Sequence, residues 1–176
     1  MAHVTREHLD RLLEQALLAD DHSSLARQLD ELALSYSSGD ISRAAILVLA
    51  ADEWRQAGQP ARAMECFQRA LEDGGDSGID PRAGIADTLF ELDRPEEARD
   101  VIATIRGEGG ANPATAHNIA ETLVAYGDLQ AGLEWVTQAV LTCAHDDPEH
   151  LALLRTRYRI RVDLGLPEDD LDALVS

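Results

Sequence analysis

A run of metal-binding residue types extends from Cys143 to His150. It places a thiol and two imidazoles beside carboxylates within eight positions, a donor set that zinc accepts. However, Asp147-Pro148 has the form of a helix N-cap followed by the first helical residue. No pair of histidines has the spacing of a zinc protease helix. We therefore interpret this run as a turn between two helices and expect no metal.

His117 is the strongest candidate for acid–base chemistry, because it precedes Asn118 and lies one turn from Glu121. Catalysis would also need a nucleophile next to a base, and the chain has no such pair and no nucleophile-elbow motif. The glycine-rich segment at 107–110 lacks the lysine of a phosphate-binding loop. We predict a protein that is not an enzyme and has no cofactor, with His117 contacting a ligand or solvent.

One basic cluster lies near the C-terminal end. Alternate residues of a helix point about 200° apart, so these arginines spread around the helix instead of forming one anion site. We expect them to pair with the acidic residues that follow and with solvent; an anionic ligand or a partner's tail is the alternative. The arginines are Arg155, Arg157, Arg159 and Arg161, and the acids are Glu168, Asp169 and Asp170.

The overall charge excludes several classes of partner. Asp and Glu number 33 against 15 Lys and Arg, for a net charge of −18 over 176 residues, so we expect no binding to nucleic acid or to anionic membranes. The hydrophobic share of 45% is too high for a disordered chain. The longest apolar run, at 44–51, is too short to cross a bilayer. With no secretory signal pattern and two distant cysteines, Cys66 and Cys143, we expect a cytoplasmic protein with reduced thiols.

The elements that must position these residues are helices. Apolar residues recur at spacings of three and four, as in Leu9, Leu12 and Leu13, and each proline lies where a helix can begin. The chain is predicted to be all-α, made of antiparallel helix hairpins with short turns. The expected helices are 5–19, 23–37, 41–57, 60–73, 81–92, 95–107, 113–126, 129–143, 148–164 and 167–175.

The short turns repeat with a regular period. Intervals of 35, 34 and 38 residues separate Gly58, Asp93, Gly127 and Gly165. Small residues recur five positions after the turns and seven positions before them, where paired helices approach most closely. Large apolar residues recur in phase between them. The small residues are Ala63, Ala98 and Gly132 after the turn, and Ala51, Ala86 and Ala120 before it.

This pattern resembles the tetratricopeptide repeat (TPR) family, which has a period of 34 residues. The clearest copy is Leu47-Ala51-Trp54-Gly58-Ala63-Phe67-Ala70, and residues 41–143 carry the resemblance. It implies one domain, 1–176, in which about ten helices form a right-handed superhelix of hairpins. The flanking segments 5–37 and 148–175 would then be capping hairpins.

In this family the first helix of each hairpin lines a concave groove that binds a peptide or a helix. An acidic residue recurs six positions before the turn, as Asp52, Asp87 and Glu121, while Arg159 occupies the matching place in the last hairpin. Acidic solvent-exposed faces alone would give the same coincidence. The resemblance implies an adaptor or scaffold that binds a basic protein or peptide. The predicted groove residues are Asp52, Arg55, Asp87, Phe90, His117, Asn118 and Glu121.

Self-association is the alternative function. Apolar residues of the terminal hairpins would then pair with a second copy to form a homodimer. The candidates are Leu151, Leu154 and Tyr158 at one end, and Leu9 and Leu13 at the other.

Overall fold

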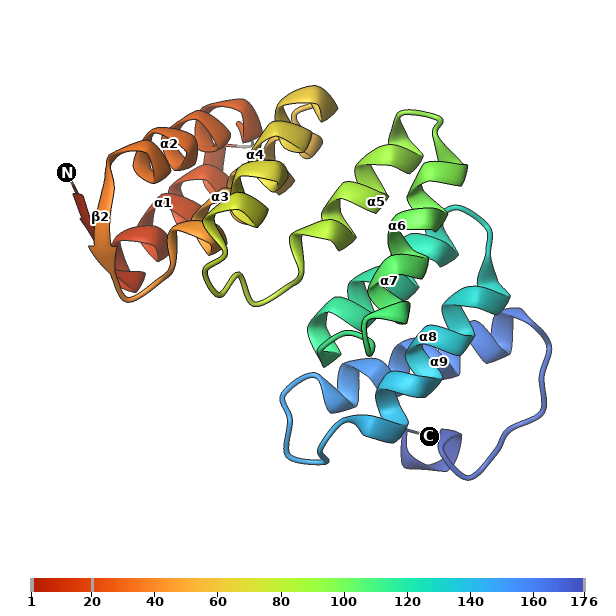
Figure 1. The fold of residues 1–176 in the computed structure, drawn as a ribbon. Helices are drawn as coiled ribbons and strands as arrows, with labels where there is room; N and C mark the ends of the chain where they lie inside the picture. The colour runs from red at the N-terminus through yellow and green to blue at the C-terminus, as the bar shows by residue number, and fades with distance from the viewer. Residues whose placement is uncertain (1, 20, 176) are drawn as a thin grey trace. The chain divides into compact units, whose positions relative to one another are not determined.

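The computed structural model describes residues 2–19 and 21–175 and divides the chain into two compact units (Figure 1). Unit 1 comprises residues 1–101 and unit 2 comprises residues 102–176. The boundary falls within helix α6, Pro95–Gly107.

Unit 1 consists of helices packed in chain order, with two short strands near its N-terminal end. Helix α2 packs on α3, α3 on α4, and α5 on both α3 and α4. The elements are β1 (Ala2–Val4), α1 (Arg6–Ala19), α2 (His22–Ser35), β2 (Tyr36–Gly39), α3 (Arg43–Gln56), α4 (Pro60–Asp73) and α5 (Pro81–Glu91).

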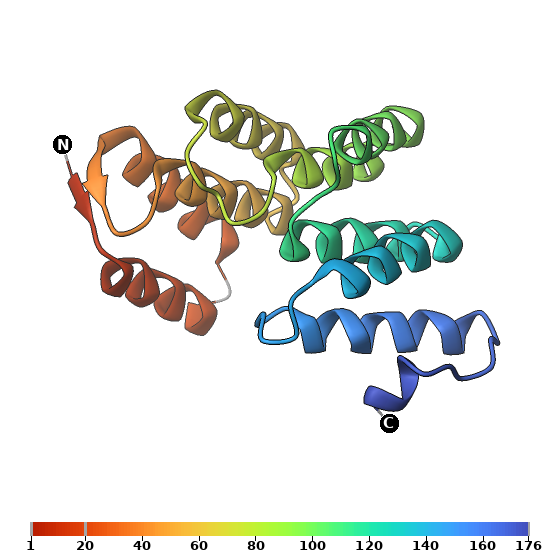
Figure 2. The same ribbon diagram turned by 60° about the horizontal axis from the view of Figure 1, so that its bottom comes forward.

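The strands β1 and β2 were not expected from the sequence. They run parallel and side by side (Figure 2), and Asp40 extends the pairing by donating its N–H to the carbonyl of Val4 at 3.0 Å. Strands of three and four residues are too short to show a period of two. A β-carbon on Gly39 would lie 2.2 Å from the Val4 carbonyl oxygen, so this close pairing requires glycine.

Unit 2 continues the arrangement of hairpins. Helix α7 packs on α8, and α9 packs on both. Capping explains where the helices begin, since Asn112 and Asp128 accept backbone N–H bonds from the first turns of α7 and α8. The elements after α6 are α7 (Pro113–Ala125), α8 (Leu129–Thr142), α9 (His150–Asp163) and the 3₁₀ turn η1 (Asp172–Leu174).

The last predicted helix, 167–175, is wrong. The chain after α9 is irregular until η1, so Pro167 begins no helix, and α9 itself begins two residues after Pro148. The side chains of Asp169 and Asp172 bond to backbone N–H groups within the same segment. Such local bonds compete with helix formation. Asp172 is also buried against Arg157, with an Oδ1–Nη1 distance of 2.7 Å.

The four turn residues that marked the repeat share one backbone conformation. Gly58, Asp93, Gly127 and Gly165 all have positive φ, at 69°, 57°, 84° and 67°. This left-handed conformation ends a helix and suits glycine. Asp93 is the one non-glycine residue with positive φ in the described part of the chain. The repeat period therefore reflects a recurring helix stop.

No helix among the described residues is both long enough and apolar enough to cross a bilayer.

Asp93→Gly should stabilise unit 1 by about 0.5–1 kcal/mol, because glycine adopts the left-handed conformation without a β-carbon clash, although it also gains entropy in the unfolded chain. The reciprocal change Gly127→Asp should destabilise unit 2 by a similar amount. Urea denaturation followed by circular dichroism measures both. If the free energy of unfolding changes in opposite directions in the two variants, the turns at 93 and 127 are equivalent. A lower free energy of unfolding for Asp93→Gly would contradict this equivalence.

Candidate functional site

In unit 1, the polar residues predicted for the groove form a cluster across α3 and α5, centred on Arg55. The Arg55 guanidinium lies 2.6 Å from Asp87 Oδ2 and 2.6 Å from Glu91 Oε1. Asp52, three residues before Arg55, is 3.9 Å away. One cation therefore serves three carboxylates, and the cluster has an excess of negative charge. We call these four residues the α3–α5 acidic cluster.

Asp52 is the least compensated member of this cluster. Desolvation by the surrounding protein raises its pKa from 3.8 to about 6; the positive charge of Arg55 opposes this shift, while Asp87, Glu53 and Glu91 add to it. Its side chain is still 47% exposed, so a group from outside can reach the carboxylate. The site therefore presents a carboxylate whose negative charge is poorly balanced and accessible.

The predicted residues of unit 2 form a second network, between α7 and α9. His117 Nδ1 lies 3.2 Å from Glu149 Oε2, and Nε2 lies 2.9 Å from the Thr156 hydroxyl. Both ring nitrogens thus have polar neighbours within the chain. A base would need a free nitrogen lone pair directed at a substrate. This arrangement suits His117 better to holding Glu149 and Thr156 than to acting as a catalytic base.

Glu121 differs from Asp52 because its charge is balanced. It accepts hydrogen bonds from Arg159 at 2.6 Å and from the Thr156 hydroxyl at 2.9 Å. Partial burial acts against ionisation, but these hydrogen bonds and the charge of Arg159 outweigh it and lower the pKa of Glu121. Glu121 and Arg159 occupy matching repeat positions, so the phase derived from the turns does place them on facing helices.

Two predicted groove residues are less available to a partner. Phe90 is 7% exposed, and the Arg99 guanidinium lies 5.9 Å from its ring centroid, so the ring belongs to the packed interior of unit 1. The buried Oδ1 of Asn118 has no hydrogen-bond partner among the described residues. A buried amide oxygen without a donor is costly, but Asn118 makes no contact that assigns it a ligand.

The metal-like run in unit 2 has a structural role at the start of α9. Asp147 accepts the N–H of Glu149 at 2.8 Å, but this bond lies within the turn before the helix, and the N-cap of α9 is Glu149, so the expected cap at Asp147-Pro148 is wrong. The His145 and His150 rings lie 4.9 Å apart at a tilt of 50°. No group of three metal-ligating side chains occurs in the described ranges. Cys143 is a buried free thiol whose pKa is raised by burial and by nearby acids.

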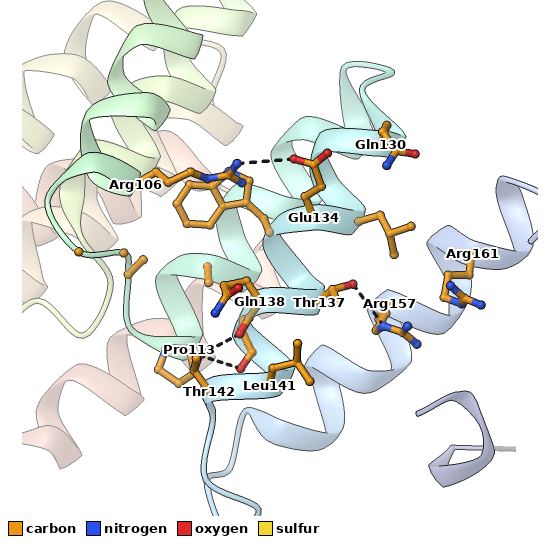
Figure 3. A pocket seen from close by; sticks show the side chains of 17 residues that line it. Arg106, Pro113, Gln130, Glu134, Thr137, Gln138, Leu141, Thr142, Arg157 and Arg161 are labelled. Carbon is orange, nitrogen blue, oxygen red and sulfur yellow. Dashed lines mark hydrogen bonds and ion pairs between the residues drawn. The ribbon is translucent and has the colours of Figure 1, made fainter. Parts of the chain in front are cut away.

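An open groove of about 1130 Å³ in unit 2 was not predicted from the sequence (Figure 3). It follows α8 and is bounded by Arg106 near one end and by Arg157 and Arg161 of α9 on one side. Arg106 lies 4.6 Å above the Trp135 ring centroid and 3.6 Å from Glu134. The groove follows the apolar Leu141, which comes directly after the buried Val140 in the sequence, and periodicity alone does not distinguish such an exposed apolar residue from a core residue.

Comparison with known proteins identifies the architecture. No family model and no curated protein matches the chain. Solved structures do match, among them a protein of Podosopora anserina described as a putative kinesin light chain with nearly identical TPR-like repeats, and a single-substitution variant of the same protein. Each is 17% identical, with TM-scores of 0.51 and 0.52, and each match covers 90% of this chain and 86% of the other. The fold is TPR-like.

In the TPR-like fold, α3, α5, α7 and α9 are the first helices of successive repeats, and α4, α6 and α8 are the second helices. The α3–α5 acidic cluster and the network around His117 therefore lie on first helices in their respective units. The groove along α8 lies on the opposite type of helix. The TPR-like chain thus offers two chemically distinct surfaces.

The carboxyl carbon of Asp52 should titrate by NMR with a midpoint near pH 6, because the folded state favours its neutral form. The unfolded state releases this proton near pH 3.8 and the folded state near pH 6, so this group lowers stability as pH rises between these values. Asp52→Asn should remove that loss.

Two neighbouring variants test the cause of this titration. Arg55→Gln should move the Asp52 midpoint upward, and Glu91→Gln should move it downward, because the two side chains act on its pKa in opposite directions. An Asp52 midpoint near 4 in the folded wild type would contradict the geometry of the cluster.

Proposed function

We propose that the chain is a protein-interaction scaffold that binds a basic peptide or helix at the α3–α5 acidic cluster. The observation that carries this proposal is the sharing of Arg55 among three carboxylates, with Asp52 accessible and poorly compensated. A guanidinium or ammonium from a partner would approach Asp52 without having to displace Arg55 from Asp87 and Glu91. Complementary charge of this kind contributes to specificity and to the rate of association.

Binding without catalysis is supported by the state of the polar groups. Both nitrogens of His117 have partners within the chain, and the two cysteines are buried thiols. Unpaired thiols also fit the reducing conditions of the cytoplasm, where we expect the protein to act. With a net charge of −18, a basic polypeptide is a better electrostatic match than a nucleic acid or an anionic membrane.

The contribution of unit 2 to this binding should be smaller. Glu121 is already paired with Arg159, so an incoming cation would have to compete with an internal one. We therefore expect His117, Asn118 and Glu121 to contribute less to binding than the α3–α5 acidic cluster of unit 1.

Self-association through α9 is a second candidate because one side of this helix is exposed. Leu151 and Val162 are 47% and 57% exposed, and Tyr158 between them is half-buried. These residues follow helical spacing along one side. Leu154 and Leu9 are buried, so they are not available for the pairing considered from the sequence.

A peptide library with one fixed arginine, flanked by randomised positions, should contain ligands for the wild-type chain. Asp52→Asn should weaken their binding several-fold and reduce its dependence on salt, because it removes the uncompensated charge. Arg55→Gln should strengthen binding, since it removes the competing internal cation. Fluorescence anisotropy at two salt concentrations measures both effects.

Glu72→Gln is the matched control for Asp52→Asn, because it makes the same charge change at an exposed position of α4. Glu121→Gln should have a smaller effect than Asp52→Asn. If Glu72→Gln and Asp52→Asn weaken peptide binding equally, the effect comes from net charge alone. That result would contradict a defined site at Asp52.

Sedimentation velocity over a hundredfold range of concentration tests the second candidate. Self-association through α9 predicts a rising sedimentation coefficient that Val162→Glu abolishes and Leu34→Glu, at an exposed position of α2, leaves unchanged. A monomer at every concentration would exclude it.

A further inference from the structure

The first helix α9 has no second helix after it within the described residues. In unit 1, α5 packs on α3 and α4; in unit 2, α9 packs in the same way on α7 and α8. Helix α6 follows α5, but an irregular tail ending in η1 follows α9. Within the described residues this repeat therefore shows no second α-helix, and the tail with η1 packs on α9 instead.

The side of the groove between α8 and α9 lies at this position. Thr137 and Leu141 of α8 line it together with Arg157 and Arg161 of α9, as Figure 3 shows. Leu141 is 65% exposed, although its neighbour in the chain, Val140, is buried. The surface thus combines an exposed aliphatic side chain with two guanidiniums.

The tail indicates which charge a ligand of this groove needs, because its carboxylates already bind these guanidiniums. Arg157 contacts Asp172 at 2.7 Å and Arg161 contacts Asp172 at 2.8 Å, while Asp169 Oδ2 lies 3.3 Å from Arg161. Asp169 also pairs with Arg157 at 2.5 Å. The Arg157 side chain is only 6% exposed with the tail in place, and a guanidinium buried in this way is stable only with a carboxylate beside it.

We propose that this groove accepts an acidic helix from another protein, which completes the last repeat and displaces the tail. Two carboxylates three residues apart would replace Asp169 and Asp172 on Arg157 and Arg161, since residues at this spacing share one side of a helix. An aliphatic residue of the same helix would cover Leu141. The tail is then a built-in competitor that keeps the guanidiniums paired until the partner binds.

The charge requirement separates this site from the α3–α5 acidic cluster. A basic helix would bring cations to the buried guanidinium of Arg157 and the half-buried one of Arg161, and both would lack a carboxylate once the tail moved away. An acidic helix would replace the carboxylates of the tail with its own, so Arg157 and Arg161 would each keep a carboxylate partner. The inference does not depend on the proposed function, because the residues, the unit and the sign of the ligand charge all differ.

The test uses the full chain and a labelled synthetic peptide with the sequence of residues 165–176. In Asp169→Asn/Asp172→Asn the resident tail is weakened, so the peptide should bind this variant about tenfold or more tightly than the wild type, in which the tethered tail competes at high effective concentration. A peptide with Asp169 and Asp172 changed to asparagine should not bind. Fluorescence anisotropy gives the affinities, and circular dichroism checks folding.

Two further variants locate the binding. Arg161→Gln, added to the double variant, should abolish peptide binding, whereas the matched change Arg155→Gln, at an exposed position of the same helix, should preserve it. Failure of the wild-type peptide to bind the folded double variant would overturn the proposal, and so would equal binding of the asparagine peptide.

Hydrogen exchange of the wild-type chain keeps the test decisive if the double variant does not fold. The amides of Leu171, Asp172 and Leu174 are hydrogen-bonded in the tail. Excess aspartate peptide should accelerate their exchange, and the asparagine peptide should not. Unchanged exchange at saturating aspartate peptide would overturn the proposal.

Discussion

The close approach of paired helices is the constraint on which the rest of the structure depends. Ala63 and Ala98 are fully buried at this position of their repeats, and in unit 2 the position is taken by Gly132. A β-carbon there would lie 2.9 Å from Val124 Cγ2 and 3.1 Å from the Ala120 carbonyl oxygen. Small residues let each second helix lie against the first, and first helices then pack beside each other. Equivalent positions on successive repeats become neighbours for this reason, as the ion pair between Glu121 and Arg159 shows in unit 2.

The ion pairs form where equivalent positions of neighbouring first helices face each other. Within unit 1, three carboxylates from two first helices meet one guanidinium; burial, aided by the neighbouring carboxylates, raises the pKa of Asp52 to about 6. Within unit 2, the tail supplies Asp169 and Asp172 to the buried guanidinium of Arg157. One unit therefore has a surplus of negative charge at a first-helix surface, while the other covers its buried cations with its own C-terminal segment.

The parts of the fold that local chemistry determines could be predicted from the sequence. Pro60, Pro81, Pro95 and Pro113 begin helices, and the four turn residues mark equivalent helix ends because left-handed backbone favours glycine. Pro167 failed as a marker because the acids after it bond to buried arginines and to nearby backbone. That outcome depends on the direction of the Arg157 side chain, which the spacing of residues in the sequence does not indicate.

The candidate site was predictable in position but not in its electrostatic state. Repeat phase placed Asp52, Asp87 and Glu121 on first helices, but it could not show that Arg55 binds across to α5 or that Glu121 is neutralised by Arg159. The exposed Leu141 and its groove depend on the absence of a helix after α9 among the described residues, and the sequence pattern had assigned a helix there.

The most direct measurement of the central claim is an ¹H–¹⁵N NMR map of the chain titrated with an arginine-containing peptide selected for binding. The account predicts that the largest shifts fall on α3 and α5, around Asp52 and Asp87, with α4 little affected. Shifts concentrated on α2 and α4, or spread evenly over acidic surface residues, would contradict a recognition site on the first helices.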